Sequence, residues 1–157
     1  MKKIIIYIGT LFIVFNCQND HSMSQEKFLY LRNEIIKNGN SSAYVELATY
    51  NEQNKLYGQT LPYSIIMINK FNYKRGYSKV AEEIISINNN GNYKINYLKN
   101  LNIADKNFVL YYLNLGLQQN DIESILLYEK IYRNGWGVEK NLIRADSLSK
   151  IYNSRIK

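Results

Sequence analysis

The sequence predicts an all-α protein built from stacked antiparallel pairs of helices. Two observations lead to this fold class. Beyond residue 24, apolar residues recur at three- and four-residue spacing, as on one face of a helix. Short turns rich in glycine and asparagine divide this region into seven or eight helical segments of about 10 to 14 residues. Such a string of short helices favours stacked pairs over a closed four-helix bundle.

The first half of this region contains four predicted helices. They cover about residues 25–37, 42–53, 63–72 and 77–87. Ser24 is a candidate N-cap of the first helix, and Gly39 is a candidate terminator. Thr60 and the early Pro62 are placed to begin the third helix. The isoleucine-rich segment 63–72 is also compatible with a buried strand, but the cap signals and the lack of a partner strand favour a helix.

The second half contains three more predicted helices and one ambiguous segment. The helices cover about residues 105–118, 121–133 and 142–152. The sequence Asn-Asn-Asn-Gly at 88–91 predicts a break, and the following segment, 93–102, is equally compatible with a short helix and a loop. Asn120 and Glu123 have the spacing of a capping box for the helix that begins near Asp121.

The most specific internal motif joins the last two predicted helices. Its sequence is YRNGWGVEKNLIRA, and its defining residues are Tyr132, Gly135, Gly137, Val138, Asn141 and Ala145. The two glycines permit a tight turn with positive φ, and we expect Val138 to pack back onto both helices. We expect Asn141 to cap the second helix, and Ala145 is small where the two helices would cross.

This motif resembles the inter-helix turn of Sel1-like repeats, a branch of the tetratricopeptide-repeat superfamily. The resemblance covers residues 120–152. Ser124 matches a small residue of the family's first helix, whereas Glu129 replaces a usual glycine. Gly39 and Gly76, 37 residues apart, begin weaker echoes of the same spacing. The resemblance implies about three repeats and an adaptor or assembly role. An unrelated helical hairpin with a Gly-x-Gly turn is the alternative.

The start of the chain has the features of an export signal. Lys2 and Lys3 precede a 12-residue apolar run at 4–15. A helix of that length rises ~18 Å, well short of the ~30 Å hydrocarbon core of a bilayer. The apolar run and Cys17, the only cysteine, resemble the signal of bacterial lipoproteins, in which this cysteine is lipid-modified. Asn16 departs from the small residue usual before that cysteine.

Three regions follow from this interpretation. We expect a signal peptide at 1–16, a lipidated Cys17 within a tether at 17–24, and a helical-repeat domain at 25–157. The protein would then be lipid-anchored in the cell envelope, at the outer membrane in a Gram-negative cell. A soluble secreted or periplasmic protein and an uncut N-terminal anchor are the alternatives.

The residue types argue against an enzyme. His21, the only histidine, lies in the tether, which excludes a histidine-based triad or zinc site in the domain. The segment 135–137 lacks the Gly-Lys-Ser/Thr of a phosphate loop. Glu82 and Glu83 are adjacent, so we expect them to point to different sides of a helix and to be solvated. We therefore assign no catalytic residue, no metal and no cofactor.

The remaining function classes involve binding or structure. The net charge of +7 falls to about +5 without Lys2 and Lys3, which is too small to indicate a nucleic-acid partner. The candidate binding residues form a basic and aromatic cluster: Lys70, Lys74, Arg75, Tyr77 and Lys79. An acidic protein or lipid headgroups would suit this cluster, and a solvated helix corner is the alternative.

We expect a protein partner, because helix-pair repeats form concave surfaces suited to peptides and helices. One version is an immunity protein that neutralises a toxin in the envelope. The alternative is a structural or envelope-stress lipoprotein with no dedicated partner.

Overall fold

The computed structural model describes residues 23–156, and over this range the chain forms helices joined by turns, with no strand. The α-helices are α1 (Gln25–Asn33), α2 (Ser41–Gln53), α3 (Leu61–Phe71), α4 (Gly76–Asn88), α5 (Ile103–Gln118), α6 (Ile122–Asn134) and α7 (Leu142–Arg155). A π-helical turn, η1 (Glu34–Asn38), continues α1, and a 3-10 helix, η2 (Ile95–Asn100), precedes α5. The predicted all-α class is confirmed, whereas the predicted signal peptide, Cys17 and His21 lie outside these residues.

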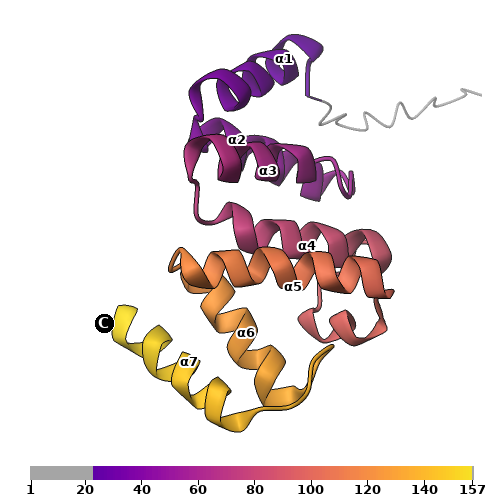
Figure 1. Cartoon of the computed structure of the whole chain (residues 1–157). Helices are drawn as coiled ribbons and strands as arrows, with labels where there is room; N and C mark the ends of the chain where they lie inside the picture. The colour runs from indigo at the N-terminus through magenta and orange to yellow at the C-terminus, as the bar shows by residue number, and fades with distance from the viewer. Residues whose placement is uncertain (1–22, 157) are drawn as a thin grey trace, which may run out of the picture.

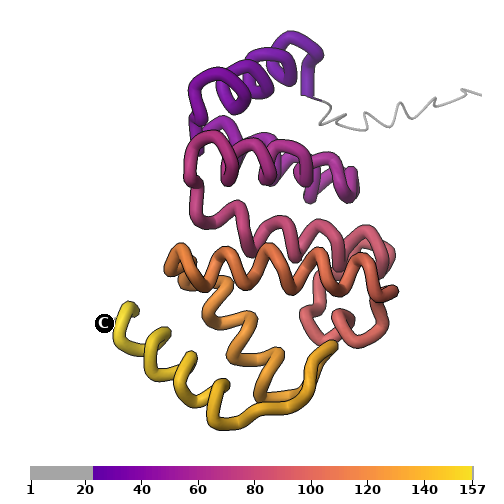
Figure 2. The backbone as a smooth tube through the Cα atoms, viewed as in Figure 1, coloured from indigo at the N-terminus to yellow at the C-terminus, as the bar shows by residue number. Residues whose placement is uncertain are grey.

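The helices are stacked along one direction, with α1 at one end and α7 at the other (Figure 1). Most neighbours in the sequence are neighbours in space: α1 packs against α2, α3 against α4, α4 against α5, and α6 against α7, whereas the backbone of α3 lies nearer to η1 than to α2. The backbone passes from one end of the stack toward the other, with η2 lying beside α6 before the chain turns back to α5 (Figure 2). Packing between successive helices therefore accounts for the architecture.

The buried core consists of three clusters that follow one another along the stack. The N-terminal cluster, from α1, η1, α2 and α3, contains Leu31, Ile35, Ala43, Tyr44, Leu47 and Met67. The central cluster contains Ile68, Tyr77 and Val80, with partly buried side chains of α3 and α5 against it. The C-terminal cluster contains Ala81, Ile85, Leu98, Leu101, Val109, Leu113, Ile125, Leu127, Tyr128, Ile131 and Leu148. Burial is thus distributed along the molecule instead of around one centre.

Several predicted helix ends are confirmed. The hydroxyl of Ser24 accepts a hydrogen bond from Lys27 N at 3.2 Å at the start of α1. Gly39 ends η1 with φ of 62°. Pro62 lies in the first turn of α3, where its missing N–H costs nothing.

One predicted cap, Thr60, is confirmed in position only, and the predicted cap of α6 is wrong. Thr60 precedes α3, but its hydroxyl makes no capping bond and instead accepts from Asn51 Nδ2 at 3.1 Å. Asn120 has φ of 59°, which places it in the turn that ends α5. The cap of α6 is therefore Asp121, which accepts from Ser124 N at 3.0 Å, and the predicted pair of Asn120 and Glu123 is not a capping box.

The structure also changes the extent of two elements. The ambiguous segment 93–102 contains the short helix η2, so the helical alternative holds for its centre. The next helix begins at Ile103, before the predicted Asp105, because Asn102 Oδ1 accepts from Asp105 N at 2.9 Å and caps it.

Candidate functional site

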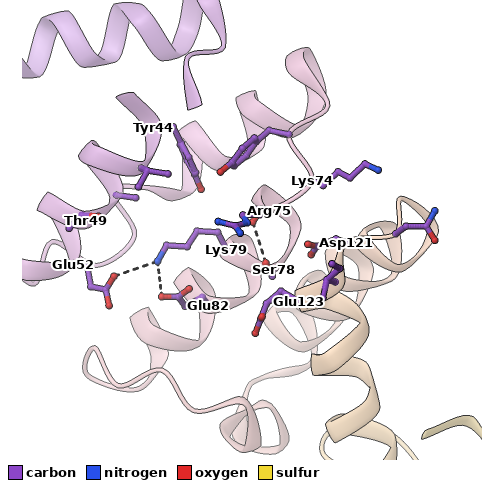
Figure 3. Close-up of a pocket in the computed structure, with 15 residues that line it drawn as sticks. Tyr44, Thr49, Glu52, Lys74, Arg75, Ser78, Lys79, Glu82, Asp121 and Glu123 are labelled. Atoms are coloured by element: carbon purple, nitrogen blue, oxygen red, sulfur yellow. Dashed lines mark hydrogen bonds and ion pairs between the residues drawn. The ribbon is translucent and has the colours of Figure 1, made fainter. Parts of the chain in front are cut away.

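A groove of about 590 Å³ opens between α2, α4 and the start of α6, and we call it the α2–α4 groove (Figure 3). It is lined by Tyr44, Val45, Ala48, Thr49, Glu52, Tyr73, Lys74, Arg75, Ser78, Lys79, Glu82, Asn120, Asp121, Ile122 and Glu123. These residues come from three helices and the corners beside them. The site therefore exists only when the helices have stacked.

Helical periodicity explains why these side chains face the groove. Residues at i, i+3, i+4 and i+7 share one face of a helix. On α2 this face is Val45, Ala48, Thr49 and Glu52, and on α4 it is Arg75, Ser78, Lys79 and Glu82. Ala48 and Ser78 are both buried and small, so the two facing helices leave space between them.

Lys79 connects the two walls of the groove. Its Nζ lies 2.7 Å from Glu82 Oε1 on α4 and 3.7 Å from Glu52 Oε2 on α2. The lysine side chain is only 18% exposed, whereas that of Glu52 is 68% exposed. The charge of Lys79 is therefore neutralised within the groove, and the outer carboxylate remains accessible to solvent.

Positive charge without a partner gathers where α4 begins. Lys74 and Arg75 are exposed there, and neither makes an ion pair within residues 23–156. The first turn of α4 contains no acidic residue, and the N-terminal end of a helix is itself partly positive. This corner of the groove is therefore suited to an anionic group.

Negative charge lies on the other lining residues. Glu123 is exposed on α6 and makes no ion pair in the described part of the chain. Asp121 is 4% exposed, and both the backbone and the hydroxyl of Ser124 donate to it, the latter at 2.5 Å. Asp121 thus fixes the start of α6, and Glu123, like the exposed Glu52, is a carboxylate available to a ligand.

The structure divides the predicted basic and aromatic cluster. Lys74, Arg75 and Lys79 line the groove. Lys70 instead donates to Ile36 O at 2.8 Å. Tyr77 is 6% exposed and belongs to the central core cluster, so its ring is not available to a ligand.

The sequence prediction missed the acidic wall of the groove. Glu52, Glu82 and Glu123 give it a mixed charge, whereas the predicted cluster was basic. The face of α2 that carries Glu52 is visible in the sequence as a helical period. Nothing local indicates that this face lies opposite α4.

Only Glu82 lines the α2–α4 groove, although both glutamates line a second hollow beside the loop after α2, and the prediction that both are solvated is wrong. Glu82 contacts Lys79 in the groove, while Glu83 Oε2 accepts from Gly58 N at 2.8 Å in the loop after α2. Both are half-buried. Burial raises the pKa of Glu83, and the hydrogen bond from Gly58 opposes this shift only in part.

The predicted repeat-turn motif connects α6 and α7. Gly135 and Gly137 have φ of 70° and 74°, as expected for a tight turn. Val138 packs against the C-terminal cluster, Asn141 Oδ1 accepts from Arg144 N at 2.9 Å, and Ala145 is fully buried. Tyr132 stacks on Tyr128 with 5.5 Å between ring centroids, and the Arg144 guanidinium lies 4.7 Å from the Tyr132 ring. These residues hold the last helix pair together and do not line the groove.

The chain matches no protein-family model, no curated protein and no solved structure. From residue 23 to 156, no helix is long and apolar enough to cross a bilayer. The same residues contain no group of three or more His, Cys, Asp or Glu side chains placed to hold a metal ion. The structure thus defines an all-α protein of successively packed helices with a mixed-charge groove.

Proposed function

We propose that this chain is a lipid-anchored helical-repeat protein that binds a partner protein through the α2–α4 groove. The observation that carries the proposal is the groove itself, in which charged and apolar side chains from α2, α4 and α6 converge. Every second helix contributes to it, as in helix-pair repeats whose alternate helices line one concave face. Mixed polar and apolar lining is typical of surfaces that bind peptide segments.

The anchor in this proposal is the lipid on Cys17. Five residues separate Cys17 from Met23, where the described structure begins, and the six steps between them span at most ~20 Å. The domain would thus remain close to the membrane of the cell envelope. A Cys17→Ala variant is expected to leave the membrane fraction.

Site-specific photocrosslinking in cells tests the binding proposal. Thr49 is an exposed residue that lines the groove, and Ser42 is an exposed residue of the same helix outside it. A photoreactive amino acid at position 49 is expected to give one discrete crosslinked protein, which mass spectrometry would identify. The same amino acid at position 42 is expected not to give this product.

The result also separates the proposal from a structural lipoprotein without a dedicated partner. Such a protein would give no product from either position, or the same mixture from both. A discrete product at position 49 that disappears in the Lys74→Glu/Arg75→Glu background would tie binding to the groove. Its persistence at full intensity would place the contact elsewhere.

A further inference from the structure

The charges of the α2–α4 groove are separated along its length. Lys74 and Arg75 supply +2 where α4 begins, with no ion pair in the described residues, and the lining there also contains the buried Asp121, whose carboxylate accepts from Ser124. Lys79 with Glu52 and Glu82 sums to −1, because two carboxylates surround one ammonium group. Figure 3 shows Glu52 and Glu82 on either side of the Lys79 ammonium group, with Lys74 toward the opposite end of the groove.

The helix itself sets the distance between the two ends. Arg75 and Glu82 are seven residues apart on or beside α4, and seven helical residues rise ~10 Å. Glu123, which faces the same groove from α6, adds a further exposed negative charge on the acidic side (Figure 3). A ligand that meets both ends must therefore carry opposite charges about 10 Å apart.

We consider an extended segment as the ligand, because it can run along the open groove from the start of α4 to Glu82. In an extended chain, side chains two and four positions apart point the same way and are ~7 and ~13 Å apart, on either side of the required separation. Between the charged ends, Val45, Ala48 and Ile122 offer small apolar surfaces to the intervening residues.

We propose that the groove binds an extended segment of the partner protein in which an acidic and a basic residue lie two to four positions apart. This inference rests on the proposed function. The acidic side chain contacts Lys74 and Arg75, and the guanidinium favours a bidentate contact with a carboxylate. The basic side chain contacts Glu123 and the second oxygen of Glu82, whose Oε1 is paired with Lys79. Because opposite charges meet at both ends, electrostatic complementarity fixes the direction of the segment.

Selection from a peptide library tests this inference without knowledge of the partner. The full chain, immobilised through a C-terminal tag, is presented with a displayed library of random linear dodecapeptides. Enriched sequences are expected to contain the acidic–basic pair at the stated spacing more often than the unselected library. Selection on the Lys74→Glu/Arg75→Glu variant is expected to lose the acidic residue from the enriched sequences.

Matched variants show whether capture occurs in the groove. Thr49→Trp fills the groove from an exposed position, and Ser42→Trp makes the same change outside it. Lys99→Glu/Lys150→Glu repeats the charge change at exposed sites away from the groove. We expect Thr49→Trp and Lys74→Glu/Arg75→Glu to lower the affinity for an enriched peptide about tenfold or more. Each control variant is expected to change that affinity by less than about threefold. Circular dichroism confirms that all four variants retain their helices.

The outcomes distinguish this inference from the proposed function. Peptides that require an open groove but lack the charge pair overturn the inference, although they still support the proposed binding function. Enriched peptides whose acidic and basic residues are spaced seven apart lead to the same conclusion, because that spacing indicates a bound helix. Peptides captured equally by the Thr49→Trp variant, or no captured peptides, also overturn the inference. The binding module fails as well if crosslinking from position 49 gives no discrete product.

Discussion

At the scale of single residues, Glu83 is held in a half-buried position between α4 and the loop after α2. Its carboxylate accepts from Gly58 N at 2.8 Å, and burial raises its pKa above that of an exposed glutamate. A raised pKa means that the folded state binds this proton more tightly than the unfolded state. The contribution of Glu83 to stability is therefore largest at acid pH and falls as pH rises through the folded pKa.

A Glu83→Gln variant isolates this effect, because glutamine remains neutral and keeps an oxygen for Gly58 N. We expect the free energy of unfolding of the variant minus that of the wild type to be larger at pH 7 than at pH 3.5, so that the variant gains stability relative to the wild type as pH rises. Urea denaturation at both pH values measures this difference. Glu139→Gln makes the same change at an exposed position and provides the baseline. A relative stability that is lower at pH 7 would show that the hydrogen bond outweighs burial.

The burial of Tyr77 shows where residue-level prediction stops. Proximity in the sequence placed Tyr77 in the basic and aromatic cluster, but it could not show which side of α4 would be covered. Gly116 of α5 lies so close that an added Cβ would be 2.9 Å from Tyr77 Cβ. Because Gly116 has no side chain, α5 can lie against Tyr77, 39 positions earlier in the sequence, and cover its ring. No local pattern around Tyr77 contains that information.

At the scale of elements, the start of α6 depends on Asp121. Its carboxylate accepts from Ser124 N and from the fully buried Ser124 hydroxyl. Removal of a cap costs about 1 kcal/mol, and a buried hydroxyl left without its acceptor costs about 1–3 kcal/mol. We therefore expect Asp121→Ala to lower the free energy of unfolding by about 2–4 kcal/mol in urea denaturation.

Glu123→Ala is the matched comparison for that prediction. Glu123 is exposed and makes no capping bond in the structure, so its removal should change stability by less than about 0.5 kcal/mol. The reverse order, with Glu123→Ala more damaging than Asp121→Ala, would support the capping box that the sequence suggested.

Local signals predicted the helices well because the causes of helix formation are themselves local. Apolar spacing, Ser24, Asn141 and the glycine turn at 135–137 act within a few residues. The groove could be predicted only in part, because its basic residues are close in sequence and its acidic residues are not. Glu52 and Glu123 lie 71 positions apart, and only helix stacking brings them to one site.

At the scale of the whole molecule, the division of the core into three clusters has consequences for stability. Each cluster is formed by helices that are close in sequence, so long-range coupling passes through intermediate helices. In architectures of this kind, stability approximates a sum of local terms and neighbour interfaces. Parts of the stack can then open separately, with different free energies.

A pair of core substitutions tests this separation. Leu47 belongs to the N-terminal cluster and Ile131 to the C-terminal cluster, and both are almost fully buried. Truncation of either to alanine removes about 2–5 kcal/mol of packing. Because neighbour coupling weakens along the stack, we expect native-state hydrogen exchange of Leu47→Ala to accelerate mainly in α1–α3, and that of Ile131→Ala mainly in α6 and α7. Equal acceleration along the whole chain in both variants would show one cooperative unit, in which the helices unfold together.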